Sequence, residues 1–266
     1  MLFTHMQKSN LLHRYSSIGI KQSLLIYWSR QLLPWTIPLL ILLVWSLAVG
    51  NWIGEEILPS PTMVLHAAYE QWQAGNLLND IGVSLRRVIV GFTLGAASGL
   101  LLGILVGLSQ LSHELLDRSL QMLRTIPHLA LVPLMILWFG IGEEPRILLV
   151  ALGTMFPIYI NTASGIRNVD SKLVEMATSY GLSRWQLVRE IIIPGAMPSI
   201  LVGIRYALGV AWLTLVIAET IASRDGIGYM VQNARELLRI DIIIFAIILY
   251  ALAGWLADWL IRKVEA

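Results

Sequence analysis

Five polar side chains in or beside long apolar stretches of this sequence are candidates to line a polar path, because a polar group there is costly unless it has a partner or water. Arg205 is the one fixed charge well inside such a stretch. Its guanidinium could face a cavity and attract an oxyanion, snorkel to lipid headgroups, or pair with a carboxylate of a neighbouring helix. Glu219, about 40° further round a helix, could gate the outer mouth of that face. We expect the other three to face protein or a wet path: Thr154, Tyr159 and Asn161.

Patterns typical of catalysis and of metal binding do not occur in the sequence. It has no cysteine, no Gly-x-Ser-x-Gly and no His-Glu-x-x-His. His128 has no second histidine or carboxylate at ligand spacing, so we expect a structural histidine. A phosphate-binding Gly-x-x-x-x-Gly-Lys-Ser/Thr is also missing. We therefore predict a protein that is not an enzyme and binds no metal or cofactor itself. An intramembrane enzyme or a membrane scaffold is the alternative from a different class.

The composition indicates an integral membrane protein. Of the 266 residues, 56% are hydrophobic and 14% are charged, and the mean hydropathy is +0.70. The net charge of +2 does not indicate a nucleic-acid partner, because the basic residues are spread over loops and do not gather on one face.

Six apolar stretches are expected to cross the bilayer as helices: residues 32–49, 88–108, 125–142, 147–166, 195–218 and 242–261. The basic residues 1–31 would form a tail, and residues 32–266 a single membrane domain. Twelve lysines and arginines fall on the side of the tail and six on the other side. By the positive-inside rule, both termini are therefore cytoplasmic. The predicted fold class is an all-α polytopic membrane protein with six transmembrane helices.

The second of these spans carries a glycine at every fourth position. Four residues correspond to about 400° of helix, so the glycines form one ridge that lets another backbone come close. No strand precedes them and no Gly-Lys-Ser/Thr follows, so they do not form a phosphate loop. We expect a helix-packing role for Gly91, Gly95, Gly99, Gly103 and Gly107.

Residues 170–194 form the longest run in the second half of the chain that is too polar to lie in a membrane. The pattern predicts a short amphipathic helix that ends at Gly181 and a second helix that ends at Pro194. Ser183 and Gln186 form a capping box at the start of the second helix. The first helix would be only about 12 Å long, so it must lie on the membrane face, exposed to the water.

Six residues of this run keep the spacing of a known motif: Glu175, Met176, Ala177, Gly181, Ile191 and Pro194. They resemble the EAA loop of binding-protein-dependent ABC import permeases. In that family the loop is a coupling helix that docks in a groove of the cytoplasmic ATPase. The resemblance implies the same role here, with ATP and Mg bound by the ATPase and not by this chain.

Residues 127–142, 151–162, 176–183 and 211–221 are similar to the aliphatic sulfonate branch of the same family, and the similarity extends from about residue 57 to 257. It implies a type I ABC importer permease (MetI-like) fold in a bacterial inner membrane. Six spans make half of a pore, so we expect a homodimer. The resemblance implies that two ABC ATPase subunits bind it. A soluble periplasmic or lipid-anchored substrate-binding protein would deliver the substrate. Nitrate or bicarbonate and taurine permeases are close relatives, and their substrates remain alternatives to a sulfonate.

Overall fold

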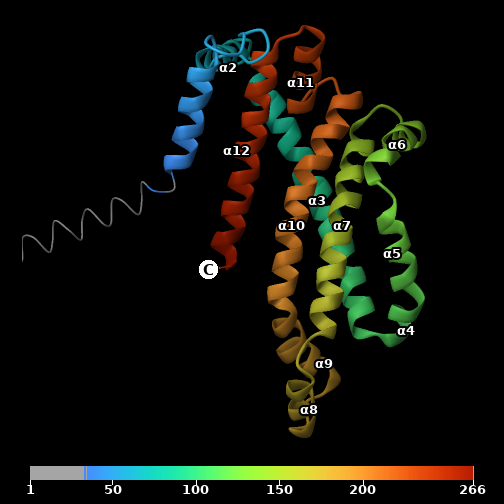
Figure 1. The fold of residues 1–266 in the computed structure, drawn as a ribbon. Helices are drawn as coiled ribbons and strands as arrows, with labels where there is room; N and C mark the ends of the chain where they lie inside the picture. The colour runs from blue at the N-terminus through green and yellow to red at the C-terminus, as the bar shows by residue number, and fades with distance from the viewer. Residues whose placement is uncertain (1–32, 34, 266) are drawn as a thin grey trace, which may run out of the picture. The chain divides into compact units, whose positions relative to one another are not determined.

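The computed structural model of the protein describes Leu33 and residues 35–265 (Figure 1). All regular elements of these residues are helices, which confirms the all-α fold class. The tail predicted at residues 1–31 lies outside the described residues.

The chain forms two compact units, one that ends at Met63 and one that begins at Val64. In the first unit a helix covers Trp35–Ala48. The indole N–H of Trp45 donates a hydrogen bond of 3.1 Å to the carbonyl oxygen of Pro59, which joins this helix to the segment that follows it.

The remaining helices follow in chain order. Those up to Phe139 are α2 (Pro61–Gln73), α3 (Leu77–Leu108), α4 (Gln110–Ser112), η1 (His113–Asp117), α5 (Arg118–Thr125), η2 (His128–Leu131) and α6 (Val132–Phe139). Those that follow are α7 (Glu143–Arg167), α8 (Ser171–Ser179), α9 (Arg184–Leu187), η3 (Val188–Ile192), α10 (Ile193–Ala222), α11 (Ile227–Glu236) and α12 (Ile240–Glu265).

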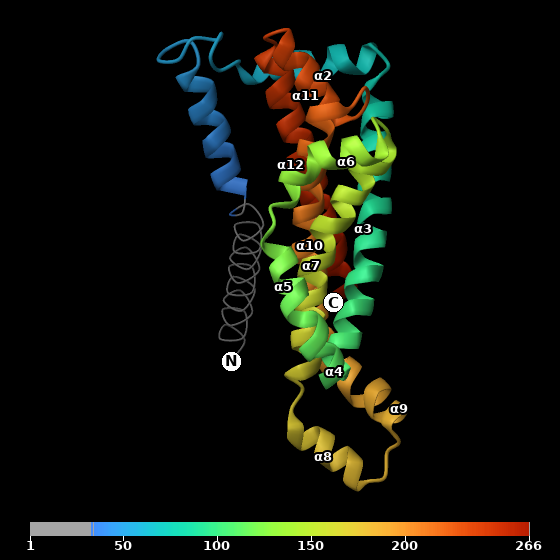
Figure 2. The ribbon, with the colours of Figure 1, turned by 90° about the vertical axis from the view of Figure 1, so that its right-hand side faces the viewer.

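Three long helices, α3, α7 and α10, run side by side through the larger unit (Figures 1 and 2). In both views α8 and α9 lie beyond one end of these helices, and α11 lies at the opposite end. Helix α12 starts at the α11 end and runs back toward the other end. The connection between α7 and α10 is therefore presented at one end of the helical bundle.

Four helices are long and apolar enough to cross a membrane: Leu77–Leu108, Glu143–Arg167, Arg184–Ile221 and Ile240–Trp259. A fifth crossing results if the bent pair Gln110–Thr125 and Leu129–Phe139 is counted as one span. The helix in the first unit is apolar but shorter. By length and composition the described residues thus hold four or five crossings, against the six that the sequence predicts.

Two of the predicted spans differ from the structure in a way that has a physical cause. The span predicted at 125–142 is not one helix, because its two parts meet at 74°. Ile126 precedes Pro127 and has an extended backbone, as the proline ring disfavours the helical conformation of the residue before it. The span predicted at 88–108 begins at Leu77, because the polar residues of its first turns are buried against other protein groups.

The glycine ridge of α3 lies against α7. A Cβ atom built on Gly91 would come within 2.8 Å of the Ile147 carbonyl oxygen, and one built on Gly99 within 2.5 Å of the Met155 carbonyl oxygen. Gly95, Gly103 and Gly107 meet successive turns of α7 in the same way. The two backbones therefore approach so closely that no side chain fits between them at these positions.

We predict that Gly99→Leu lowers the free energy of unfolding by about 1 to 3 kcal/mol or more, because the added side chain forces α3 away from α7. Gly82→Leu is the matched control, since Gly82 lies on the same helix with no atom near its would-be Cβ. The unfolding temperature and the yield of monodisperse protein in detergent measure the effect. Equal stability of both variants with the parent would contradict the close α3–α7 packing.

Candidate functional site

The segment of residues 170–194, here called the α8–α9 segment, is a helix, a glycine turn and a second helix. Asp170 caps α8 by accepting a hydrogen bond of 2.9 Å from the backbone N–H of Lys172. Gly181 has φ +81°, a conformation that side chains with a Cβ rarely adopt. Ser183 and Gln186 form the predicted capping box, which starts α9 directly after the turn.

The second helix of this segment does not end at Pro194 as the sequence predicts. Residues from Arg184 to Ile221 form one continuous helical run that leads into α10. The π-helical turn η3 precedes Pro194, which stands in the first turn of α10, where a missing backbone N–H is tolerated. The α8–α9 segment is thus connected to a membrane-crossing helix without a flexible joint.

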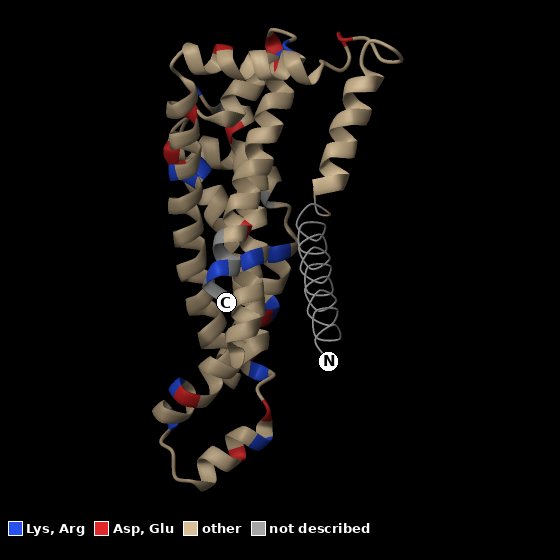
Figure 3. Cartoon of the chain, turned by 90° about the vertical axis from the view of Figure 1, so that its left-hand side faces the viewer, with Lys and Arg blue, Asp and Glu red and all other residues tan. Residues whose placement is uncertain are grey.

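The α8–α9 segment carries charged residues of both signs (Figure 3), and several of its large apolar side chains are exposed. Met176 is 49% exposed, Tyr180 80% and Trp185 71%, whereas Ala177 is buried. Glu175 lies exposed on the same short helix, and Ile191 is half-buried in η3. Exposed aromatic and methionine side chains are enriched at protein interfaces, so this surface suits a protein partner.

The structure does not bring the five predicted path residues together. Thr154 is buried beside the glycine ridge and donates its hydroxyl to the Val150 carbonyl oxygen at 2.9 Å. Tyr159 is also buried, and its hydroxyl donates to the Asp117 carboxylate at 2.6 Å. Asn161 alone among the three opens onto a hollow, which lies between α5, α7 and α10.

Arg205 forms an ion pair with Asp258 of α12, with 3.7 Å between Nε and Oδ1. Their side chains are half-buried. This pair matches one of the alternatives predicted for Arg205, in which it pairs with a carboxylate of a neighbouring helix. Its other predicted role, to attract a passing anion, stays a prediction.

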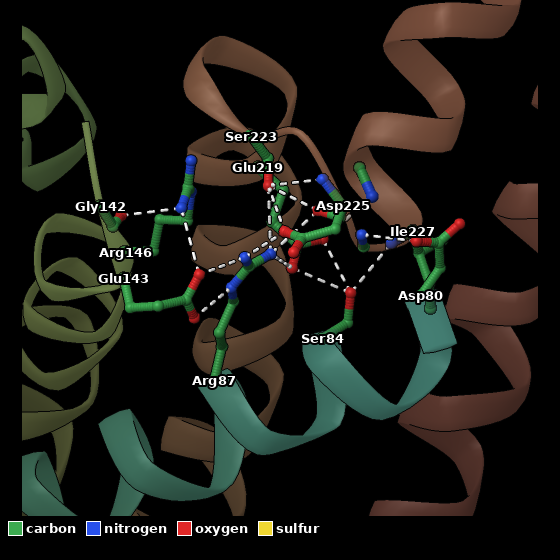
Figure 4. Close-up of polar contacts among 12 residues, drawn as sticks. Asp80, Ser84, Arg87, Gly142, Glu143, Arg146, Glu219, Ser223, Asp225 and Ile227 are labelled. Atoms are coloured by element: carbon green, nitrogen blue, oxygen red, sulfur yellow. Dashed lines mark hydrogen bonds and ion pairs between the residues drawn. The ribbon is translucent and has the colours of Figure 1, made fainter. Parts of the chain in front are cut away.

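Glu219 is fully buried and belongs to a polar cluster at the α11 end of the molecule (Figure 4). Its carboxylate accepts hydrogen bonds from Ser84 at 2.8 Å, from Arg87 at 2.7 Å and from the backbone N–H of Gly228 at 2.9 Å. A carboxylate with this many donors is held in place. It therefore fastens helices together and does not face an open mouth on the side of Arg205.

Arg87 is the centre of this cluster, and its side chain has no exposed surface. Besides Glu219 it binds Glu143 of α7, with 2.9 Å between Nε and Oε2, and Asp225 in the loop after α10. Burial by itself would raise the pKa of the Asp225 carboxyl, but the hydrogen bond from Arg87 holds that pKa below its usual range. One guanidinium thus joins α3, α7, α10 and the loop before α11.

This cluster is not evident in the sequence, because Arg87 and Arg146 lie just outside the predicted spans 88–108 and 147–166, and Asp225 lies between the last two predicted spans. The signal that could have found it is the spacing of Asp80, Ser84 and Arg87, which places three polar side chains on one face of a helix. Polar residues at helical spacing next to an apolar span indicate a buried polar contact as readily as a loop.

We predict that Arg87→Met destabilises the protein by about 3 to 5 kcal/mol, because it leaves the fully buried Glu219 carboxylate, and the partly exposed Glu143 and Asp225, without their cation. Arg86→Met is the matched control, since Arg86 is the neighbouring residue and is exposed. Thermal unfolding in detergent gives the comparison. If Arg87→Met unfolds at the temperature of the Arg86→Met variant, the cluster does not hold the outer helix ends together.

Comparison with known proteins agrees with the geometry. The model of the family described as "Binding-protein-dependent transport system inner membrane component" matches residues 99–266. The chain is 54% identical to the aliphatic sulfonates transport permease protein SsuC of Escherichia coli, over 87% of this chain and 88% of that protein. It is 43% identical to the protein of the same name from Bacillus subtilis, over 90% of this chain and 86% of that protein.

Among solved structures, a chain of the MetNI methionine ABC transporter in an inward-facing conformation matches with a TM-score of 0.58 and 18% identity. The match covers 72% of this chain and 97% of that chain, and it shows that the two share a fold. The family match over most of the chain and the high identity to two curated permeases lead to one conclusion. This chain belongs to the family of binding-protein-dependent transport system inner membrane components.

Proposed function

We propose that this chain is the membrane-spanning subunit of an ABC importer for aliphatic sulfonates. The assignment of a sulfonate as the substrate rests on the 54% identity to a sulfonate transport permease over nearly the whole chain. A nitrate, bicarbonate or taurine importer of the same family is the alternative substrate class.

The α8–α9 segment is the docking site that we propose for an ABC ATPase, which binds ATP and Mg. Its exposed Met176, Tyr180 and Trp185 provide the apolar contact, and Glu175 provides a charge. The full transporter would hold two copies of this chain, two ATPases and a substrate-binding protein at the α11 end. In this arrangement the α8–α9 segment and both termini face the cytoplasm, in keeping with the positive-inside bias.

The connection from the docking site into the membrane suggests how ATP could drive transport. A movement of α8 would pass across the Gly181 turn to α9. From there it would pass into α10, since α9, η3 and α10 form one helical run. At its far end α10 carries Glu219, which is tied through Arg87 to α3 and α7. A shift at the ATPase end would therefore reach the opposite end of the bundle, as alternating access requires.

The substrate assignment predicts that cells whose own sulfonate importers are deleted take up short-chain alkanesulfonates when they express this chain with its ATPase and binding protein. Radiolabelled ethanesulfonate is the probe, with excess nitrate and taurine as competitors. Displacement of the label by other alkanesulfonates but not by nitrate or taurine is expected. Uptake that is abolished by the same excess of nitrate or taurine would assign the transporter to the alternative class.

The docking assignment predicts that Gly181→Val leaves the protein in the membrane but lowers ATP-driven uptake about ten-fold or more, because valine strongly disfavours positive φ. Gly75→Val is the control, since Gly75 has φ +78° and open space around it but lies far along the chain from the α8–α9 segment. The ATPase that co-purifies with each variant is quantified beside uptake. Normal uptake and ATPase recovery in Gly181→Val would remove the docking role.

A further inference from the structure

A hollow of about 360 Å³ lies between α5, α7 and α10. Its wall is made of a few polar groups and several apolar side chains: Arg124, Gly153, Phe156, Pro157, Ile160, Asn161, Tyr206 and Val210. Phe156 and Pro157 stand near the middle of the 25-residue helix α7. The hollow is therefore at mid-depth in the membrane, where a substrate on its way through must pass.

Arg124, in the wall of the hollow, differs from Arg205 and Arg87 in having no carboxylate partner among the described residues. Arg205 is paired with Asp258, and Arg87 is surrounded by carboxylates. Arg124 makes no ion pair or hydrogen bond with another residue that the structure describes, and its side chain is exposed. A cation at mid-depth that is not neutralised by protein groups favours an anion at its side.

The position of Arg124 follows from the break in the chain before Pro127. Helix α5 ends at Thr125, before the extended Ile126 and Pro127, so Arg124 lies in its last turn. Arg124 shares the wall of the hollow with Gly153, Phe156 and Pro157 of α7. The proline break thus places a guanidinium opposite the middle of α7.

The rest of the wall fits the two parts of an alkanesulfonate. One N–H of the Asn161 amide donates to the Pro157 carbonyl oxygen at 2.8 Å. Its second N–H and the Tyr206 hydroxyl can donate hydrogen bonds to sulfonate oxygens next to the forked guanidinium of Arg124. Phe156, Ile160 and Val210 provide an apolar surface for the alkyl chain. Nitrate has no such chain and would leave this surface uncovered.

We infer that this hollow is the membrane site where the permease holds its substrate, with Arg124 binding the sulfonate head and the apolar wall binding the alkyl chain. The inference rests on the proposed function and adds the residues that recognise the substrate. It replaces Arg205 by Arg124 as the cation that meets the anion.

Arg124→Gln tests the head-group contact and Arg124→Lys tests its charge. Uptake of ethanesulfonate is expected to fall about ten-fold or more in the Gln variant and to recover in part in the Lys variant, as for loss of a hydrogen bond to a charged group. Arg118→Gln is the matched control, since Arg118 is an exposed arginine on the same helix. ATPase co-purification and basal ATP hydrolysis must stay at the parental level, which separates a binding loss from failed assembly.

Val210→Phe tests the apolar wall by a ratio that does not depend on the amount of protein. The larger phenylalanine side chain would occupy part of the hollow beside the apolar wall. Uptake of octanesulfonate should therefore fall relative to uptake of ethanesulfonate, measured with both labels in one sample. An unchanged ratio together with normal uptake in Arg124→Gln would overturn the hollow as the substrate site. If the parent itself fails to take up any sulfonate, the proposed function fails and not only this site.

Discussion

The buried charge of Arg87 sets the arrangement of the helix ends on the α11 side. A guanidinium without exposed surface must be neutralised by protein groups, and Glu143, Glu219 and Asp225 supply the negative charge from α7, α10 and the following loop. Removing Arg87 would leave the buried Glu219 carboxylate without its cation. The four elements are therefore held in one arrangement at this end.

Close backbone packing holds the helices together along their length, as Arg87 holds them together at their ends. The glycine ridge of α3 seats α7, and Gly165 and Gly203 let α7 approach α10 in the same way. Three helices packed this closely move together more readily than they slide, since interdigitated surfaces have few intermediate positions. The continuous run from α9 into α10 then links this rigid group to the α8–α9 segment, whose surface is open to a partner.

Local features of the chain could be predicted from the sequence, whereas contacts between distant residues could not. The capping box at Ser183 and the glycine turn at Gly181 depend on neighbours a few residues away, and both occur in the structure. The arrangement of the helices was implied by the family motif, since hydrophobic periodicity alone does not specify how helices pack. Glu219 and Arg87 are 132 residues apart, so their pairing is invisible in the pattern, and Glu219 was assigned to an open mouth. Arg124 was missed because residues 125–142 were expected to form one span, which would leave Arg124 just outside it; the structure instead ends α5 at Thr125, before Pro127.

The most direct measurement is accumulation of an alkanesulfonate in proteoliposomes that contain the complex of this chain with its ATPase, supplied with the binding protein. With ATP and Mg on the ATPase side, the structure and its family predict that labelled ethanesulfonate is concentrated inside against its gradient. Accumulation should stop when a non-hydrolysable ATP analogue replaces ATP or when the binding protein is left out. Equal entry of the label with and without ATP, or none in an assembled complex that hydrolyses ATP, would contradict the assignment of this chain as the permease of a sulfonate importer.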